Sequence, residues 1–221
     1  SGGLIGKSAY SSAGTNGSGY SGTGSNAGLS STGGPLTMEQ WIKRADYSSS
    51  EKAMCQMYDL QLYMSASGIM TIRSDGVNSN TRDTAGSQTA PFTDGKWHHV
   101  AFVYDAGQTN KRRLWIDGKE HILDNADGTV GLSNVNDYFI GRYYSNTNYN
   151  MDGEIGYLRI WDEARTETEI RANMFKRTPT DSNSKCKINL LFDEGTGTTV
   201  DNIGTVGSAG DATLGGALWA G

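Results

Sequence analysis

The sequence predicts an all-β protein in which two antiparallel sheets pack face to face as a sandwich. A run rich in β-branched and aromatic residues, 97–104, is joined by a polar loop to a similar run, 113–116. The second run closes on Asp117-Gly118, a pair that tolerates the backbone angles of a tight hairpin. The composition, with 30 glycines, 11 tyrosines, 5 tryptophans and only 3 prolines, suits many short strands, tight turns and an aromatic core.

The other strands are predicted from residues that alternate between two faces with a period of two. In the run 36–42, Leu36 and Ile42 point to one face, and Thr37 and Trp41 point to the other. Further strands are expected at 53–57, 61–64, 69–73, 138–142, 153–161 and 187–192, with the last strands near 210–214.

One short helix is expected after the strand 153–161. The run 166–169 reads Thr-Glu-Thr-Glu, which is a capping box. Ile170 and Met174, with Phe175 as a further candidate, would supply the apolar face of this helix.

Residues 1–34 consist almost entirely of Gly, Ser, Ala, Thr and Asn. This composition is typical of a flexible linker, but the short apolar groups around Ala9-Tyr10 and Tyr20 also fit irregular edge strands. We expect an ordered but loop-rich segment within a single domain that spans residues 1–221, since a chain of this length suits one large sandwich.

Several motifs together resemble the laminin-G-like, pentraxin-like and concanavalin A-like jelly-roll domain. The motifs are the run 97–105, the hairpin 113–119, the segments 138–142 and 153–161, and the helix start at 164–170. The resemblance covers roughly residues 36–221 and is strongest between 97 and 170. It implies a two-sheet antiparallel jelly roll with one short helix, and it indicates architecture more firmly than activity.

The charge pattern excludes some partners. The chain has a formal charge of −5 and a pI near 5.2, and its Lys and Arg residues are scattered among acids. No basic face is expected to follow a phosphate backbone, so nucleic acid is not an expected partner. Membrane insertion is not expected either, because no apolar run reaches the roughly 18 residues of a span. The start at Ser1 suggests a piece of a longer protein.

Cys55 and Cys186 each lie in a predicted strand. A disulfide between them would suit a secreted domain, whereas two buried thiols would act as small apolar residues, and the spacing leaves both options open.

Catalysis is not expected. Glucanases of this fold use a strand with the pattern Glu-x-Asp-x-(x)-Glu, and the lyases use an Arg-rich strand and a Gln-x-His strand; neither pattern occurs here. Asp162, Glu163, Glu167 and Glu169 lie at a predicted strand end and helix start, where the helix dipole stabilises acids.

The three histidines are expected to be packing or surface residues. His98 and His99 are consecutive on a strand and face opposite sides, so they cannot bind one metal ion together, and His121 stands apart.

A predicted loop between two strands carries the residue types that bind sugars. Tyrosine rings stack on the C–H faces of sugars, while amides and arginine hydrogen-bond hydroxyls. The proposed binding residues are Arg142, Tyr143, Tyr144, Asn146, Asn148 and Tyr149. The polar segment 75–82 would either line the same rim or form a separate loop.

Calcium is a candidate cofactor, because extracellular jelly rolls often use this ion and it prefers carboxylate and carbonyl oxygens. In many relatives an Asp of the segment Gly-x-Ile-Asp-Glu contributes to such a site, but here its position is taken by Gly156. Asp152 and Glu154 are the candidate ligands that remain.

The sequence therefore predicts a non-catalytic, lectin-like module that binds a glycan or polysaccharide, secreted or displayed on a cell surface as part of a larger protein. The alternatives are a protein-binding or structural adhesion module, with a protein receptor as partner, and a polysaccharide-degrading enzyme on the same fold.

Overall fold

The computed structural model describes residues 8–11, 19–20, 34–44, 52–57, 60–64, 69–75, 82–89, 94–109, 111–122, 138–141, 151, 153–181, 184–215 and 218–220. The strands are β1 (Ser8–Ser11), β2 (Gly19–Tyr20), β3 (Leu36–Arg44), β4 (Lys52–Met57), β5 (Leu60–Met64), β6 (Ile69–Asp75), β7 (Arg82–Thr89), β8 (His98–Tyr104), β9 (Arg112–Ile116), β10 (Lys119–Ile122), β11 (Tyr138–Ile140), β12 (Gly153–Trp161), β13 (Cys186–Leu190), β14 (Thr199–Val200), β15 (Ala212–Gly215) and β16 (Leu218–Ala220). The helices are α1 (Glu167–Asn173) and the 3₁₀ helix η3 (Gly207–Gly210).

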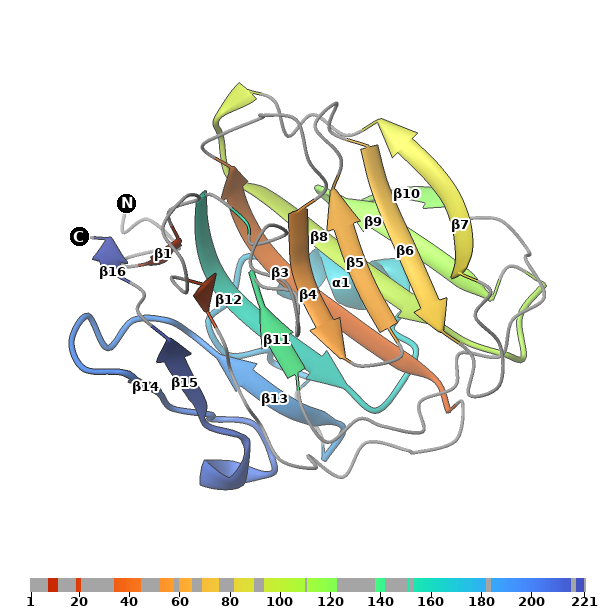
Figure 1. Ribbon diagram of the computed structural model, residues 1–221. Coiled ribbons are helices and arrows are strands. Elements are labelled where there is room, and N and C mark those ends of the chain that lie inside the picture. Colours follow the sequence, from red (N-terminus) through yellow and green to blue (C-terminus); the bar gives the residue numbers. More distant parts are fainter. Residues whose placement is uncertain are drawn as a thin grey trace.

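The described strands form two main antiparallel sheets. The eight-stranded sheet has the order β10-β9-β8-β3-β12-β1-β16, and β13 also pairs with β12. The five-stranded sheet has the order β11-β4-β5-β6-β7 and lies in front of the larger sheet in Figure 1. A smaller sheet of three strands, β14-β15-β2, lies beside them. This architecture confirms the predicted all-β antiparallel sandwich.

The core lies between the two main sheets because each sheet turns one apolar face inward. Residues of β3, β8 and β12 on one side face residues of β4, β5 and β11 on the other, and all are buried. The predicted alternation in β3 is confirmed, since Leu36 and Ile42 belong to this core while Thr37 and Trp41 do not.

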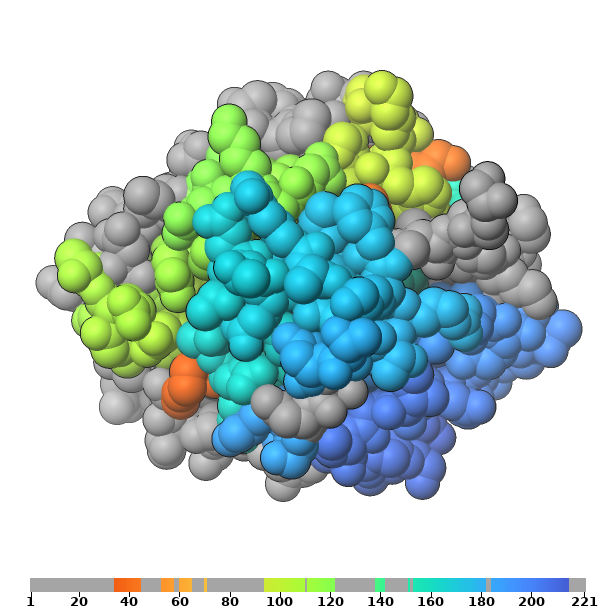
Figure 2. All heavy atoms as spheres, turned by 180° about the vertical axis from the view of Figure 1, so that it is seen from behind, coloured from red at the N-terminus to blue at the C-terminus, as the bar shows by residue number. Residues whose placement is uncertain are grey.

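Helix α1 covers the outer face of the eight-stranded sheet. Thr166 is its N-cap and forms the predicted capping box with Glu169. Ile170 packs against Ala101, Val103 and Trp115, which explains why β8 is apolar on both faces. In Figure 2 the segment containing α1 runs across the middle of this back face. The expectation for Phe175 is wrong: it follows the helix, is 53% exposed and contacts Trp41.

Three strands were not predicted. β7 has no apolar alternation and lies at the edge of its sheet, where a strand is paired on one side only. β16 is the edge strand of the larger sheet, next to β1. β14 is a two-residue strand paired with β15. The predicted strand 187–192 ends earlier, at Leu190, and Phe192 adopts a positive φ of 54°.

Two open questions from the sequence receive partial answers. Ala9-Tyr10 lies in β1, between β12 and β16, and Tyr20 lies in β2, so parts of 1–34 do form strands. The rest of that segment up to residue 33 lies outside the described residues. Cys55 and Cys186 are both buried free thiols, so they form no disulfide.

Candidate functional site

The predicted sugar-binding residues lie in the segment 142–150, which is outside the described residues, but both ends of this segment are described. At the first end, Gly141 has a φ of 64° and its N–H donates to the carbonyl of Met54 in β4 over 2.8 Å. At the other end, the N–H of Met151 donates to the carbonyl of Gly141 over 2.8 Å. We call this pair of hydrogen bonds the neck. The neck therefore holds Gly141 and Met151, the residues on either side of the segment 142–150, next to each other.

The neck is rigidly attached to the sandwich. Ile140 and Met151 are fully buried in the core on either side of the loop. Just beyond it, Gly153 opens β12 with a φ of 151°, and a Cβ at this position would lie 2.2 Å from the carbonyl oxygen of Lys43. Only glycine permits this close approach of β12 to β3. The loop 142–150 is therefore attached where the two sheets meet, between β11 and β12.

A row of polar and aromatic side chains crosses the outer face of the five-stranded sheet. Phe139 pairs with Gln56, Gln56 pairs with Gln61, and Gln61 pairs with Arg73 in the strand register. Tyr63 lies on the same face of β5, and its hydroxyl donates to Gln61 Oε1 over 2.9 Å.

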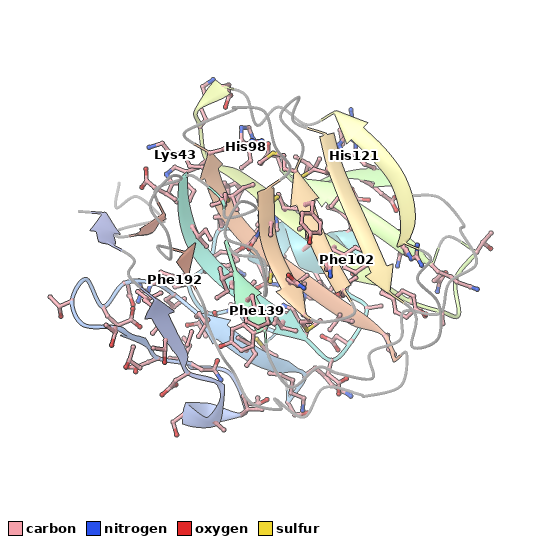
Figure 3. All side chains as sticks on the ribbon, viewed as in Figure 1. Lys43, His98, Phe102, His121, Phe139 and Phe192 are labelled. Atoms are coloured by element: carbon pink, nitrogen blue, oxygen red, sulfur yellow. The ribbon has the colours of Figure 1, made fainter. Side chains whose placement is uncertain are left out.

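This row lies on the side opposite to the core residues of the same strands. Phe139, Gln56, Gln61 and Tyr63 are all buried, so they form a packed layer rather than an open surface. The row begins on β11, the strand that leads into the loop 142–150, and Phe139 is marked there in Figure 3.

Sequence reasoning missed this row. Gln56 and Gln61 interrupt apolar runs in β4 and β5, and that interruption is the one signal the sequence offers. The signal becomes meaningful only once the register aligns the two glutamines across the strands.

A buried charged network lies on the outer face of the other sheet, beneath α1. Arg159 Nη1 lies 3.2 Å from Glu39 Oε1, and both side chains are fully buried. Trp161 Nε1 also donates to Glu39 Oε1 over 3.3 Å, and His99 Nε2 lies 3.4 Å from Glu39 Oε2. Burial raises the pKa of Glu39, but His99 and the charge of Arg159 outweigh it and lower this pKa to about 2.

The same network satisfies the carbonyl groups at the end of α1. Arg159 donates to the carbonyls of Asn173, Lys176 and Arg177. The carbonyl of Met174 accepts from Trp41 Nε1 over 2.7 Å and from Tyr157 Oη over 2.8 Å. Asn173 and Met174 lie at the end of α1, where carbonyls lack partners within the helix, and Lys176 and Arg177 follow directly after it. The network therefore attaches α1 to the sheet and is structural, because Glu39 and Arg159 are closed to any ligand.

The candidate acids for catalysis also have structural partners. Glu163 contacts Arg165 Nη1 at 3.1 Å, Glu167 pairs with Arg171 at 2.8 Å, and Asp162 lies 3.9 Å from Lys185. Burial raises the pKa of Cys55 and of Cys186 to about 12, so neither thiol is a nucleophile near neutral pH.

The candidate calcium ligands are only partly placed. Asp152 lies outside the described residues, and Glu154 Oε1 lies 2.8 Å from Lys43 Nζ. Within the part of the chain that the structure describes, no three His, Cys, Asp or Glu side chains come together in a way that could hold a metal ion. If Glu154 bound calcium, its ion pair with Lys43 would have to break.

The histidines lie on opposite faces, as expected for consecutive residues of a strand. His99 is buried beside Glu39 and between the rings of Trp41 and Tyr157. His98 contacts two carboxylates at the end of β8 and is marked in Figure 3.

Two packed antiparallel sheets, with a helix on the outer face of one, form a β-sandwich of the jelly-roll class. A family model of the concanavalin A-like lectin/glucanases superfamily matches residues 15–171. The chain belongs to this superfamily, which confirms the resemblance to laminin-G-like modules. No match to a protein of curated function was found.

Solved structures share this fold. A Bacteroides ovatus protein that is proposed to bind carbohydrate aligns with a TM-score of 0.66 at 17% identity, covering 97% of this chain and 58% of that one. This chain thus spans little more than half the length of that protein. The heptameric SAP-like pentraxin of Limulus polyphemus aligns with a TM-score of 0.55 at 16% identity, covering 79% and 83% of the two chains.

A third similar structure is the CBM40 domain of the Ruminococcus gnavus IT-sialidase bound to alpha2,3 sialyllactose. It aligns with a TM-score of 0.55 at 14% identity, covering 72% of this chain and 96% of that one. At such identities these similarities show the fold alone. None of the described helices is long and apolar enough to cross a membrane.

Proposed function

We propose that this protein is a non-catalytic, extracellular glycan-binding module of a larger protein, and that it binds through the loop 142–150. The observation that carries the proposal is the neck: Gly141 and Met151 join the ends of a loop that contains Arg142, Tyr143, Tyr144, Asn146, Asn148 and Tyr149. A segment whose two flanking residues are already held together loses less conformational entropy on binding than one with free ends. Similar folds in a sialyllactose-bound CBM40 domain and a carbohydrate-binding candidate support the ligand class.

The row on the five-stranded sheet supports the same proposal. Phe139 and Gln56 lie next to the strand end from which the loop departs, and they fix the position of its base. The loop would then provide the ring faces and amides that reach the sugar.

The test is a glycan array followed by calorimetry with the glycan that binds best. The double variant Tyr143→Ala/Tyr149→Ala removes two stacking rings, each worth about 1 kcal/mol, so affinity should fall roughly 30-fold. Phe175→Ala is the matched control, because Phe175 is an exposed aromatic residue at the end of α1, and it should leave affinity unchanged.

Other outcomes would decide against the proposal. Capture of a protein partner with no response to any glycan would favour the protein-binding or adhesion alternative. Hydrolysis of a polysaccharide that disappears in Glu154→Gln or Glu163→Gln would show that the module is an enzyme.

Calcium binding at Asp152 and Glu154 is a separate part of the proposal. The chemistry of these residues supports a calcium site, because calcium prefers oxygen ligands and two carboxylates flank Gly153 at the start of β12.

A further inference from the structure

His98, the first residue of β8, contacts two carboxylates through its two ring nitrogens. Nδ1 lies 2.7 Å from Oδ2 of Asp117, in the turn between β9 and β10. Nε2 lies 3.0 Å from Oδ1 of Asp94, in the segment that precedes β8. The side chain of His98 is 9% exposed, whereas those of Asp94 and Asp117 are 36% and 43% exposed, so solvent reaches both contacts from the carboxylate side.

This geometry requires a particular protonation state. An ionised carboxylate can only accept hydrogen bonds, and a neutral imidazole has only one N–H to donate. Both contacts are satisfied together only by the imidazolium form of His98. Partial burial opposes this charge, but the hydrogen bonds to Asp117 and Asp94 outweigh it and raise the pKa of His98 above its ordinary value.

The two carboxylates are held with unequal strength. Asp117 is fixed to the sheet, because its Oδ1 accepts from the N–H of His99 over 2.9 Å and its own N–H donates to the His99 carbonyl over 2.9 Å. The next residue, Gly118, is held by Arg171 of α1, whose Nε donates to its carbonyl over 2.6 Å.

Asp94 is bonded mainly within its own short segment. Its Oδ1 accepts from the N–H of Lys96 over 2.8 Å, and its Oδ2 lies 3.4 Å from Lys96 Nζ. The side chain of Asp94 is 36% exposed, and in the described part of the chain its contact with the sheet is the one to His98.

We propose that Asp94, His98 and Asp117 form a pH-dependent latch that holds the segment 94–96 onto the end of the sheet while His98 is protonated. When His98 loses its proton, the remaining N–H stays on Nδ1, facing the fixed Asp117 over the shorter distance. Nε2 then presents a lone pair to Asp94, so this contact turns repulsive and the segment is released.

The latch lies at the end of the eight-stranded sheet that is next to the neck. The strand register places His98 opposite Ile42, and Ile42 opposite Ile155 of β12. Gly153, which follows the neck, is two residues from Ile155 in the same strand. The latch and the base of the loop 142–150 therefore lie at the same end of the eight-stranded sheet. The proposal itself does not depend on glycan binding.

In the described chain the charged groups that contact His98 are Asp94 and Asp117, and Lys96 contacts Asp94. Since the folded state raises the pKa of His98, the latch is closed below the pKa of an unfolded histidine. It opens as the pH rises through the folded value.

The test is an NMR titration of the ring nitrogens of His98 in the full chain. His121 is an internal control, because burial and the charge of Lys119 lower its pKa, so His98 should titrate at clearly higher pH than His121. Asp94→Asn and Asp117→Asn should each lower the midpoint of His98, since each removes a negative charge beside the ring.

Hydrogen exchange tests the release of the segment. After correction for its intrinsic pH dependence, exchange at the Lys96 amide should rise at least threefold over the pH range in which His98 titrates, while the Asp117 amide stays protected. The proposal is overturned if His98 titrates at or below the midpoint of His121, or if the exchange of Lys96 does not follow that titration.

Discussion

The guanidinium of Arg159 and the carboxylate of Glu39 form an ion pair with an N–O distance of 3.2 Å in which neither side chain is exposed to solvent. Arg159 comes from β12 and Glu39 from the neighbouring strand β3, where the two residues are register partners. The pair is the centre of the network that attaches α1 to the outer face of the eight-stranded sheet.

Replacing Glu39 by Gln should destabilise the protein strongly. The substitution leaves the Arg159 charge buried without its counter-ion, a loss that typically costs about 3–5 kcal/mol. The measurement is urea unfolding at neutral pH. The matched control is Lys43→Ala, which removes the partly exposed Lys43–Glu154 pair and should cost less than about 1 kcal/mol. Equal effects of the two variants would show that the buried pair has no special role.

The ionisation of Glu39 should also make the free energy of unfolding depend on pH. Its pKa is lowered to about 2 in the folded state from an ordinary value of 4.5, so the stabilisation is complete above the unfolded value and is lost as the pH falls toward 2. The check is the difference in unfolding free energy between the wild type and Glu39→Gln, measured from pH 7 to pH 2.5. The difference should be constant above about pH 5 and should shrink below about pH 4. A constant difference over the whole range would contradict the assigned pKa.

Gly153→Ala should destabilise the junction between the loop 142–150 and β12. An added Cβ would lie 2.2 Å from the carbonyl oxygen of Lys43, and the φ of 151° is itself unfavourable for alanine. We expect a loss of about 3 kcal/mol or more in thermal or urea unfolding. Gly207→Ala is the control, because its φ of 58° is also positive but nothing lies within 4 Å of the new Cβ, so it should cost about 1 kcal/mol.

If calcium binds at Asp152 and Glu154, it should raise the melting temperature. A ligand that binds only the native state stabilises it in proportion to the logarithm of its concentration. The measurement compares the melting temperature in calcium with that in excess chelator. The substitution Asp152→Asn should abolish the difference between these two temperatures. Identical melts for the wild type would rule out a stabilising ion.

The strands that could be predicted are those whose sequence alone reveals the two faces. The residues of β3 and β8 alternate or are apolar throughout, because one face contacts the core and the other contacts α1 and its network. The capping box at Thr166 was predictable as well, since it depends on residues only three positions apart.

The features that could not be predicted depend on pairings between distant parts of the chain. Gln56 and Gln61 become a row only when β11, β4 and β5 are in register. Asp117 becomes a partner of His98 only when the hairpin turn folds back beside β8. The sequence likewise gives no sign that Gly141 and Met151 lie side by side, since this depends on the hydrogen bond from the Met151 N–H to the Gly141 carbonyl.

The most direct measurement of the central claim is NMR chemical-shift mapping of the isotope-labelled chain as the best-binding glycan is added. Binding by the loop 142–150 predicts that the largest shifts occur in that loop and at its attachment points, Gly141 and Met151, with little change at Ile170 in α1. Largest shifts at the back face around α1, or no shift with any glycan, would contradict it.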